Sequence, residues 1–122
     1  MAIIINLMVG FVAFLHLVFL FLEMFLWNTK IGHNIFKLDS DFAKKSSVLA
    51  SNQGLYNGFL AAGLIWSLCT SDGQESFHLK VFFLVCVIVA GVYGAMTANK
   101  NIFFLQAMPA IVALLLVVIF KK

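Results

Sequence analysis

Charged residues are scarce in this sequence, and arginine is missing altogether. Only 11% of the 122 residues are charged, all eight basic residues are lysines, and 63% of the chain is hydrophobic. A soluble domain of this size leaves much of its surface in water, so it cannot bury so many apolar side chains. The composition therefore argues against an ordinary soluble domain and predicts a chain whose long apolar runs lie in a lipid bilayer.

Cysteine and clustered histidine are scarce too. Cys69 and Cys86 lack the spacing of a redox motif or a zinc site, and His33 and His78 fall in predicted loops on opposite sides. We therefore predict no metal and no cofactor. The lysines flank apolar runs and form no basic face with interleaved aromatics, so we predict no nucleic-acid partner.

Four apolar stretches have nearly the length or the full length of about 20 residues that a membrane-spanning helix needs. The predicted fold is an all-α membrane bundle of four transmembrane helices in one domain, with an interfacial segment between the first two helices. Asp39-Ser40-Asp41 is typical of a helix N-cap, so the second helix should begin there and continue unbroken into its span. The expected helices cover residues 3–27, 41–69, 77–97 and 102–120.

The lysines also bear on orientation in a multi-pass cell-membrane protein. Five lysines lie on the side of the first and third loops and three on the other side. Lysine-rich loops favour the cytoplasmic face, so this distribution favours both termini outside.

Small residues recur every fourth position in the second helix, at Ala50, Gly54, Gly58 and Ala62. Such a ladder lets two helix backbones approach closely in lipid. Two interpretations stay open: packing inside one four-helix bundle, and a homodimer through Gly54 and Gly58.

Proline occurs once, near the start of the fourth helix. Pro109 lacks a backbone N–H and should free a carbonyl one turn earlier, near Leu105 or Gln106. A loosened backbone there could serve a ligand site, although proline is also ordinary in the first turns of a helix.

Polar residues gather toward one end of the predicted bundle. His16, Glu23 and Trp27 are seven and four residues apart, which places them on one face of the first helix. An ionisable residue inside a span is costly and by default indicates function, so Glu23 is the centre of the candidate ligand-binding site. Antiparallel threading brings polar residues of the other helices to the same leaflet: Asn52, Gln53, Tyr56, Asn57, Tyr93 and Gln106.

Four short patterns carry a resemblance to a known family. They are H-x6-E-M-F-x-W from His16, V-L-A-x-N-Q-G-L-Y-N-G-F-L-A-A-G from Val48, G-x-Y-G-A from Gly91 and Q-x-x-P-A from Gln106. Through them nearly the whole chain resembles the small bacterial integral membrane proteins catalogued as domain-of-unknown-function 1304. The resemblance implies a four-helix protein of the bacterial inner membrane and implies no activity.

Three functions are compatible with the polar cluster. In the first, the protein binds or transports a small amphipathic or cationic molecule, with Glu23 as the anionic anchor and aromatic rings as cation–π faces. In the second, the cluster only joins helices in a structural or accessory membrane subunit. In the third, a membrane enzyme such as an isomerase uses Glu23 and His16 as acid and base on a lipophilic substrate. We rank them in this order and assign no catalytic residue.

Overall fold

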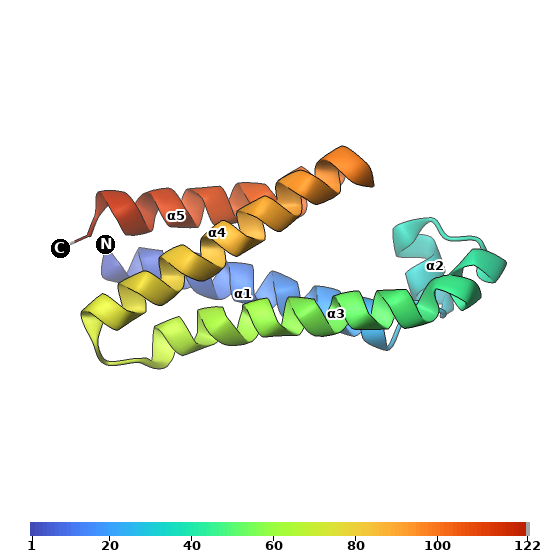
Figure 1. The fold of residues 1–122 in the computed structure, drawn as a ribbon, viewed down its shortest axis with the longest axis horizontal. Helices are drawn as coiled ribbons and strands as arrows, with labels where there is room; N and C mark the ends of the chain where they lie inside the picture. Colours follow the sequence, from blue (N-terminus) through green and yellow to red (C-terminus); the bar gives the residue numbers. More distant parts are fainter. Residues whose placement is uncertain (122) are drawn as a thin grey trace. The chain divides into compact units, whose positions relative to one another are not determined.

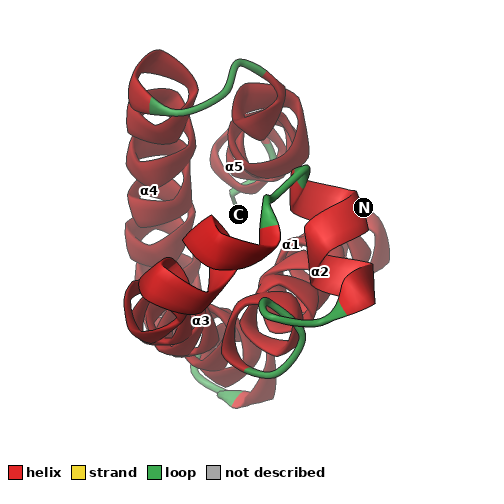
Figure 2. Cartoon of the chain, turned by 90° about the vertical axis from the view of Figure 1, so that its right-hand side faces the viewer, coloured by secondary structure: helices red, strands yellow, loops and turns green. Residues whose placement is uncertain are grey.

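The computed structural model describes residues 1–121, and every regular element in that range is a helix (Figure 2). The predicted all-helical fold is confirmed. Figure 1 shows the helices in sequence colours. In chain order they are α1 (Ala2–Met24), α2 (Lys30–Phe36), α3 (Ser40–Cys69), α4 (Gly73–Thr97), the π-helical η1 (Phe103–Ala107) and α5 (Met108–Ile119).

Aspartate caps set where α3 and α4 begin. The Asp39 carboxylate accepts the backbone N–H groups of Asp41 at 3.1 Å and Phe42 at 3.2 Å, and α3 runs unbroken from there to Cys69, as predicted. α4 begins four residues earlier than expected, because Asp72 caps it in the same way. The sequence contains a signal for this earlier start, because Glu75 follows Asp72 by three positions, the spacing of a capping box.

α1 ends at Met24, so the prediction that it extends to Trp27 is wrong. A turn follows in which the Thr29 hydroxyl donates to the Leu26 carbonyl at 2.6 Å and then caps α2. The segment predicted to be interfacial contains this two-turn helix, which ends at Lys37 in the left-handed conformation (φ 52°).

The chain forms two compact units, each described by itself. Unit 1 comprises Met1–Leu15 and the chain from Leu60 onward, and unit 2 comprises His16–Phe59. α1 and α3 each contribute one part to unit 1 and the other part to unit 2.

Unit 1 has an apolar core to which α1, α3, α4 and α5 all contribute. In this unit α4 packs against η1 and α5. The contact is close at Gly91, where a Cβ would lie 2.6 Å from the backbone nitrogen of Ala107. The buried core residues are Val9, Val12, Ala13, Leu64, Leu84, Val87, Ala110, Ala113 and Val117.

The backbone of unit 1 is widened just before Pro109. The Met108 N–H bonds to the Phe103 carbonyl, five residues earlier, which defines the π-helical turn η1. A π-turn in a helix often occurs where an ordinary hydrogen bond is lost, and frequently at functional sites. The loosened backbone expected near Leu105 and Gln106 therefore takes this form.

Two helices are long and apolar enough to cross a membrane. Over its most apolar stretch of 18 residues, α1 has a mean hydropathy of 2.6 and α4 one of 2.3. Only 28% and 17% of these stretches are buried, whereas the core helix of a soluble protein is mostly buried. The segment Phe103–Ile119 is apolar but shorter. Among the described residues, length and composition thus support two crossings, and four crossings stay a prediction.

Candidate functional site

The centre of the candidate site is a hydrogen bond between α1 and α3 inside unit 2. Asn57 Nδ2 donates to Glu23 Oε1 at 2.8 Å, although the two residues are 34 positions apart. Both side chains are half-buried. Glu23 sits in the last turn of α1 and Asn57 near the middle of α3. The structure thus pairs Glu23 with Asn57, one of the polar residues that the sequence placed at the same end of the bundle.

Glycine on α3 makes this pairing possible. A Cβ on Gly54 would lie 3.0 Å from the Glu23 Cβ and 3.1 Å from the Leu20 carbonyl oxygen, and one on Gly58 would lie 2.6 Å from Leu20 Cδ1. The Gly54–Gly58 face therefore packs against α1 within the chain. A homodimer through this face stays a prediction.

The last small residue of the predicted ladder, Ala62, does not lie on the same face of α3 as Gly54 and Gly58. Ala50 and Gly54 are buried, but Ala62 is exposed and Ala61 is buried in its place. Because a helix turns 100° per residue, positions four apart drift by about 40° at each step, or about 120° from Ala50 to Ala62. A spacing of four thus predicted the first half of the contact and missed the second.

Glu23 has no cationic partner in the part of the chain that the structure describes. Among residues 1–121 the structure contains a single ion pair, between Lys45 and Asp41, and its groups are exposed. An ionised carboxylate offers about four acceptor positions, and the bond from Asn57 occupies one. The site therefore combines a half-buried carboxyl group with unused acceptor capacity, which suits a ligand that brings a positive charge or a hydrogen-bond donor.

Trp27 lies elsewhere than the sequence predicted, because α1 ends before it. Its indole Nε1 donates to Ser46 Oγ at 3.0 Å, and its ring packs on Phe36 with centroids 4.8 Å apart. Ser46 precedes Asn57 by eleven residues, which is about 16 Å along a helix. Trp27 thus ties the turn and α2 to the first part of α3, a role that the sequence did not reveal.

The other predicted site residues of α3 face outward. Asn52 donates to the Val48 carbonyl of its own helix at 2.9 Å and is exposed, as is Gln53. Tyr56 is 52% exposed and its ring lies 6.1 Å from that of Phe59. These side chains lie outside the Glu23–Asn57 contact, although they follow one another on the same helix.

The remaining predicted residues have different surroundings. His16 is fully buried in α1, with its ring edge-on to Phe19 at 5.5 Å. Tyr93 and Gln106 belong to unit 1, where Tyr93 is 68% exposed and Gln106 lies in η1. Of the nine predicted residues, the structure brings Glu23 and Asn57 into contact, whereas Trp27, Asn52, Gln53 and Tyr56 lie away from that contact. The ligand-binding role of the nine residues stays a prediction.

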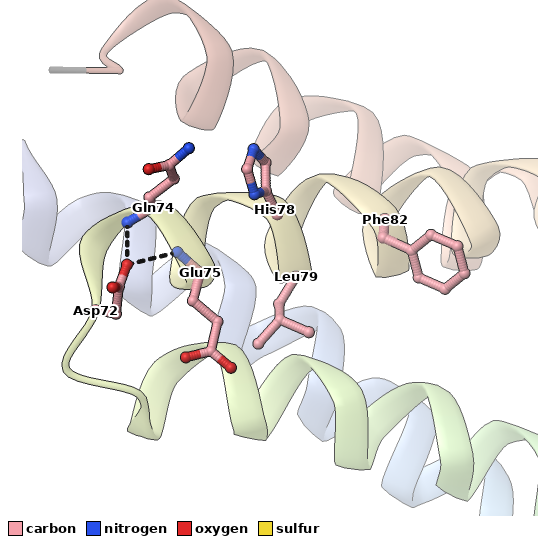
Figure 3. A pocket seen from close by; sticks show the side chains of 6 residues that line it. All are labelled: Asp72, Gln74, Glu75, His78, Leu79 and Phe82. Atoms are coloured by element: carbon pink, nitrogen blue, oxygen red, sulfur yellow. Dashed lines mark hydrogen bonds between the residues drawn. The ribbon is translucent and has the colours of Figure 1, made fainter.

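Sequence reasoning missed two hollows in unit 1 near the first turns of α4. The first, of about 470 Å³, is lined by Asp72, Glu75 and His78 among others (Figure 3). Asp72 is engaged in capping, Glu75 accepts the Thr70 hydroxyl at 2.8 Å, and in Figure 3 the side chains of Glu75 and His78 point to different sides. In the described chain no three His, Cys, Asp or Glu residues come together to hold a metal ion.

The second hollow, of about 510 Å³, lies between the start of α1, the start of α4 and the end of α5. Lys80 Nζ donates to Asn6 Oδ1 across it at 2.8 Å. A signal was present in the sequence, since a lysine within the third predicted helix and an asparagine near the start of the first fall on the same side of an antiparallel bundle.

Comparison with known proteins adds a family. Residues 10–118 match the family described as "Protein of unknown function (DUF1304)". The chain is 34% identical over 98 residues to the "Uncharacterized protein YpaA" of Lactococcus lactis subsp. lactis (strain IL1403). The aligned region covers 79% of this chain and 81% of that protein. No solved structure matches the chain. The resemblance inferred from the sequence patterns is confirmed.

Proposed function

Since this chain belongs to the DUF1304 family, whose description names no activity, we propose its function from the chemistry of its own residues. The protein is a multi-pass membrane protein that binds a small cationic or amphipathic molecule at Glu23. Transport of that molecule across the membrane is the activity that we propose this binding to serve.

Outward-facing side chains support the membrane placement. Large apolar residues are exposed along the predicted spans, for example Ile3 at 75%, Val89 at 62% and Met96 at 80%. Contact of such an apolar surface with water is unfavourable, whereas contact with lipid tails is not. We propose that α3 and the η1–α5 segment cross the membrane as well as α1 and α4, which gives four spans in the cell membrane.

The observation that carries the binding proposal is the uncompensated carboxyl group of Glu23. It lies in a largely apolar helix, its one protein hydrogen bond comes from the neutral amide of Asn57, and no lysine or histidine of the described chain forms an ion pair with it. A carboxylate in a membrane is stable when a cation pairs with it. A ligand with a positive charge and an apolar body satisfies both the carboxylate and the lipid around it.

A structural role is the second candidate, and the close packing at Gly54 favours it. The Glu23–Asn57 bond joins α1 to α3 next to the close contact at Gly54, which is what a bond that only stabilises packing would do. An accessory subunit would need this bond but no ligand.

Glu23→Gln separates the two candidates. Glutamine keeps an oxygen that can accept the Asn57 amide hydrogen, so stability should change by no more than about 0.5 kcal/mol. It removes the negative charge, so binding of tetraphenylphosphonium to detergent-purified protein should weaken by about ten-fold or more, as expected for the loss of a charge pair shielded from water. Binding is measured by titration calorimetry and stability by thermal unfolding of the same samples.

Glu75→Gln is the matched control, because it removes one acidic charge in unit 1 and should leave cation binding unchanged. Unchanged binding in Glu23→Gln would overturn the binding proposal. Wild-type protein that binds no cation, together with a loss of stability in Asn57→Ala, which removes the bond to Glu23, would establish the structural role instead.

A further inference from the structure

The second hollow of unit 1 brings two lysines together at the ends of three helices. It is lined by residues from the start of α1, the first turns of α4 and the end of α5, and its two charged lining residues are Lys80 and Lys121. The hollow is therefore positively charged, in contrast to the acidic centre of unit 2.

Neither lysine is neutralised within the described part of the chain, where the single ion pair lies in unit 2. Lys80 Nζ uses one of its three N–H donors on the neutral Asn6 amide. Lys121 Nζ lies 4.1 Å from the centroid of the Phe77 ring, a cation–π contact that holds the charge in place without cancelling it. Both ammonium groups thus keep donors and charge for an anion.

The rest of the hollow is partly polar, with Asn6, Gln74 and Ser76, and partly apolar. Ile5, Phe77, Val117 and Phe120 line it beside the two lysines. Inorganic phosphate would gain nothing from these side chains, whereas a molecule with a phosphate head and a hydrocarbon tail could contact both parts. Basic hollows between membrane helices are a known mode of anionic-lipid recognition.

We propose that this hollow binds the phosphate headgroup of an anionic phospholipid, with Lys80 and Lys121 on the phosphate and the acyl chain along the exposed side chain of Phe120. The inference rests on the membrane placement proposed above, but it is independent of the Glu23 ligand.

Native mass spectrometry of the full chain in detergent tests the proposal, with phosphatidylglycerol and phosphatidylcholine added at equal concentration. Wild-type protein should retain phosphatidylglycerol preferentially. The double variant Lys80→Gln/Lys121→Gln should bind it about 30-fold more weakly, since each lysine near an anionic lipid contributes a factor of about five. The double variant Lys30→Gln/Lys100→Gln has the same charge change away from the hollow and should behave like wild type.

A second variant guards against misfolding: Lys80→Arg/Lys121→Arg keeps both charges and should keep the preference. Equal retention of the two lipids by wild type would overturn the proposal, and so would full displacement of phosphatidylglycerol by millimolar inorganic phosphate, which would identify a soluble anion as the ligand. The Glu23→Gln variant should retain the lipid. Protein that stays soluble without detergent would refute the membrane placement itself, whereas membrane protein without a lipid preference would refute only this inference.

Discussion

The two units of the chain differ in the interactions that hold the helices together inside each unit. Unit 1 is joined by a continuous apolar core, from Val9 of α1 to Val117 of α5. Unit 2 is joined by side-chain hydrogen bonds over long sequence separations, Glu23 with Asn57 and Trp27 with Ser46, and by glycines that let helices touch. In lipid an apolar side chain gains little by turning inward, so close packing and polar bonds decide which faces meet.

The contrast extends to what glycine contacts in each unit. In unit 1, Gly91 faces the backbone of Ala107, while in unit 2, Gly54 faces mainly the side chains of Met24 and Glu23. Backbone cannot move without shifting a helix, whereas a side chain can adopt another rotamer. The helix contact at Gly54 should therefore tolerate a larger side chain better than the contact at Gly91 does, whereas the turn of unit 2, where Gly32 faces backbone atoms, is an exception.

That exception gives the largest expected effect. In Gly32→Ala the new Cβ would overlap the Leu26 carbonyl oxygen and lie 2.5 Å from that of Trp27. Because both are backbone atoms, the loss of stability should reach about 3 kcal/mol or more, the upper end for overpacking. Thermal unfolding in detergent measures it.

Gly73→Ala is the control for this change, since nothing lies within 4 Å of a Cβ at Gly73. It should leave stability the same or raise it by up to about 1 kcal/mol, as alanine favours a helix over glycine. Similar unfolding temperatures for the two variants would show that the turn in unit 2 is not tightly packed.

Gly91→Ala and Gly54→Ala compare the two helix contacts directly. A Cβ at Gly91 would lie 2.6 Å from the Ala107 nitrogen, whereas one at Gly54 would lie 2.7 Å from the Met24 Cγ. We expect a loss of about 2 kcal/mol for Gly91→Ala and about 1 kcal/mol for Gly54→Ala, because only the second contact can relax by a rotamer change. The reverse order in equilibrium unfolding would contradict the assignment of the rigid contact to unit 1.

Asn57→Ala tests the polar bond of unit 2. Removing the amide leaves Glu23 without its protein donor and should cost about 1–2 kcal/mol. Asn52→Ala is the matched control, since the exposed Asn52 bonds only within its own helix, and it should change stability by no more than about 0.5 kcal/mol. Equal losses in denaturant titrations of the two variants would mean that the bond from Asn57 stabilises nothing specific.

Local signals in the sequence predicted the helices better than their contacts. The N-cap at Asp39 placed the start of α3 because capping involves residues two or three apart. The same chemistry at Asp72 was present in the sequence and was overlooked. The end of α1 carried no such local mark, because the turn after Met24 depends on Thr29, Gly32 and the distant Ser46.

For the candidate site, the sequence identified the carboxyl group but not all of its surroundings. Glu23 stood out as an acid in an apolar run, and antiparallel threading placed the amides of the next long helix at the same end of the bundle. Which amide Glu23 would contact depended on the rotation of α3, and a helix rotates 100° per residue. That rotation turns Asn57 toward Glu23 and leaves Asn52 and Gln53 exposed.

The sequence by itself determined the helical class of this protein, its apolar character and its one acid within an apolar run, since these follow from composition and from spacing along the chain. Only the tertiary structure decided that Asn57 is the partner of Glu23, that Trp27 binds Ser46, and that Lys80 and Lys121 share a hollow. Each of these depends on how far one helix is rotated against another. The rotation is set by the close contacts of many residues together, and no single stretch of sequence contains it.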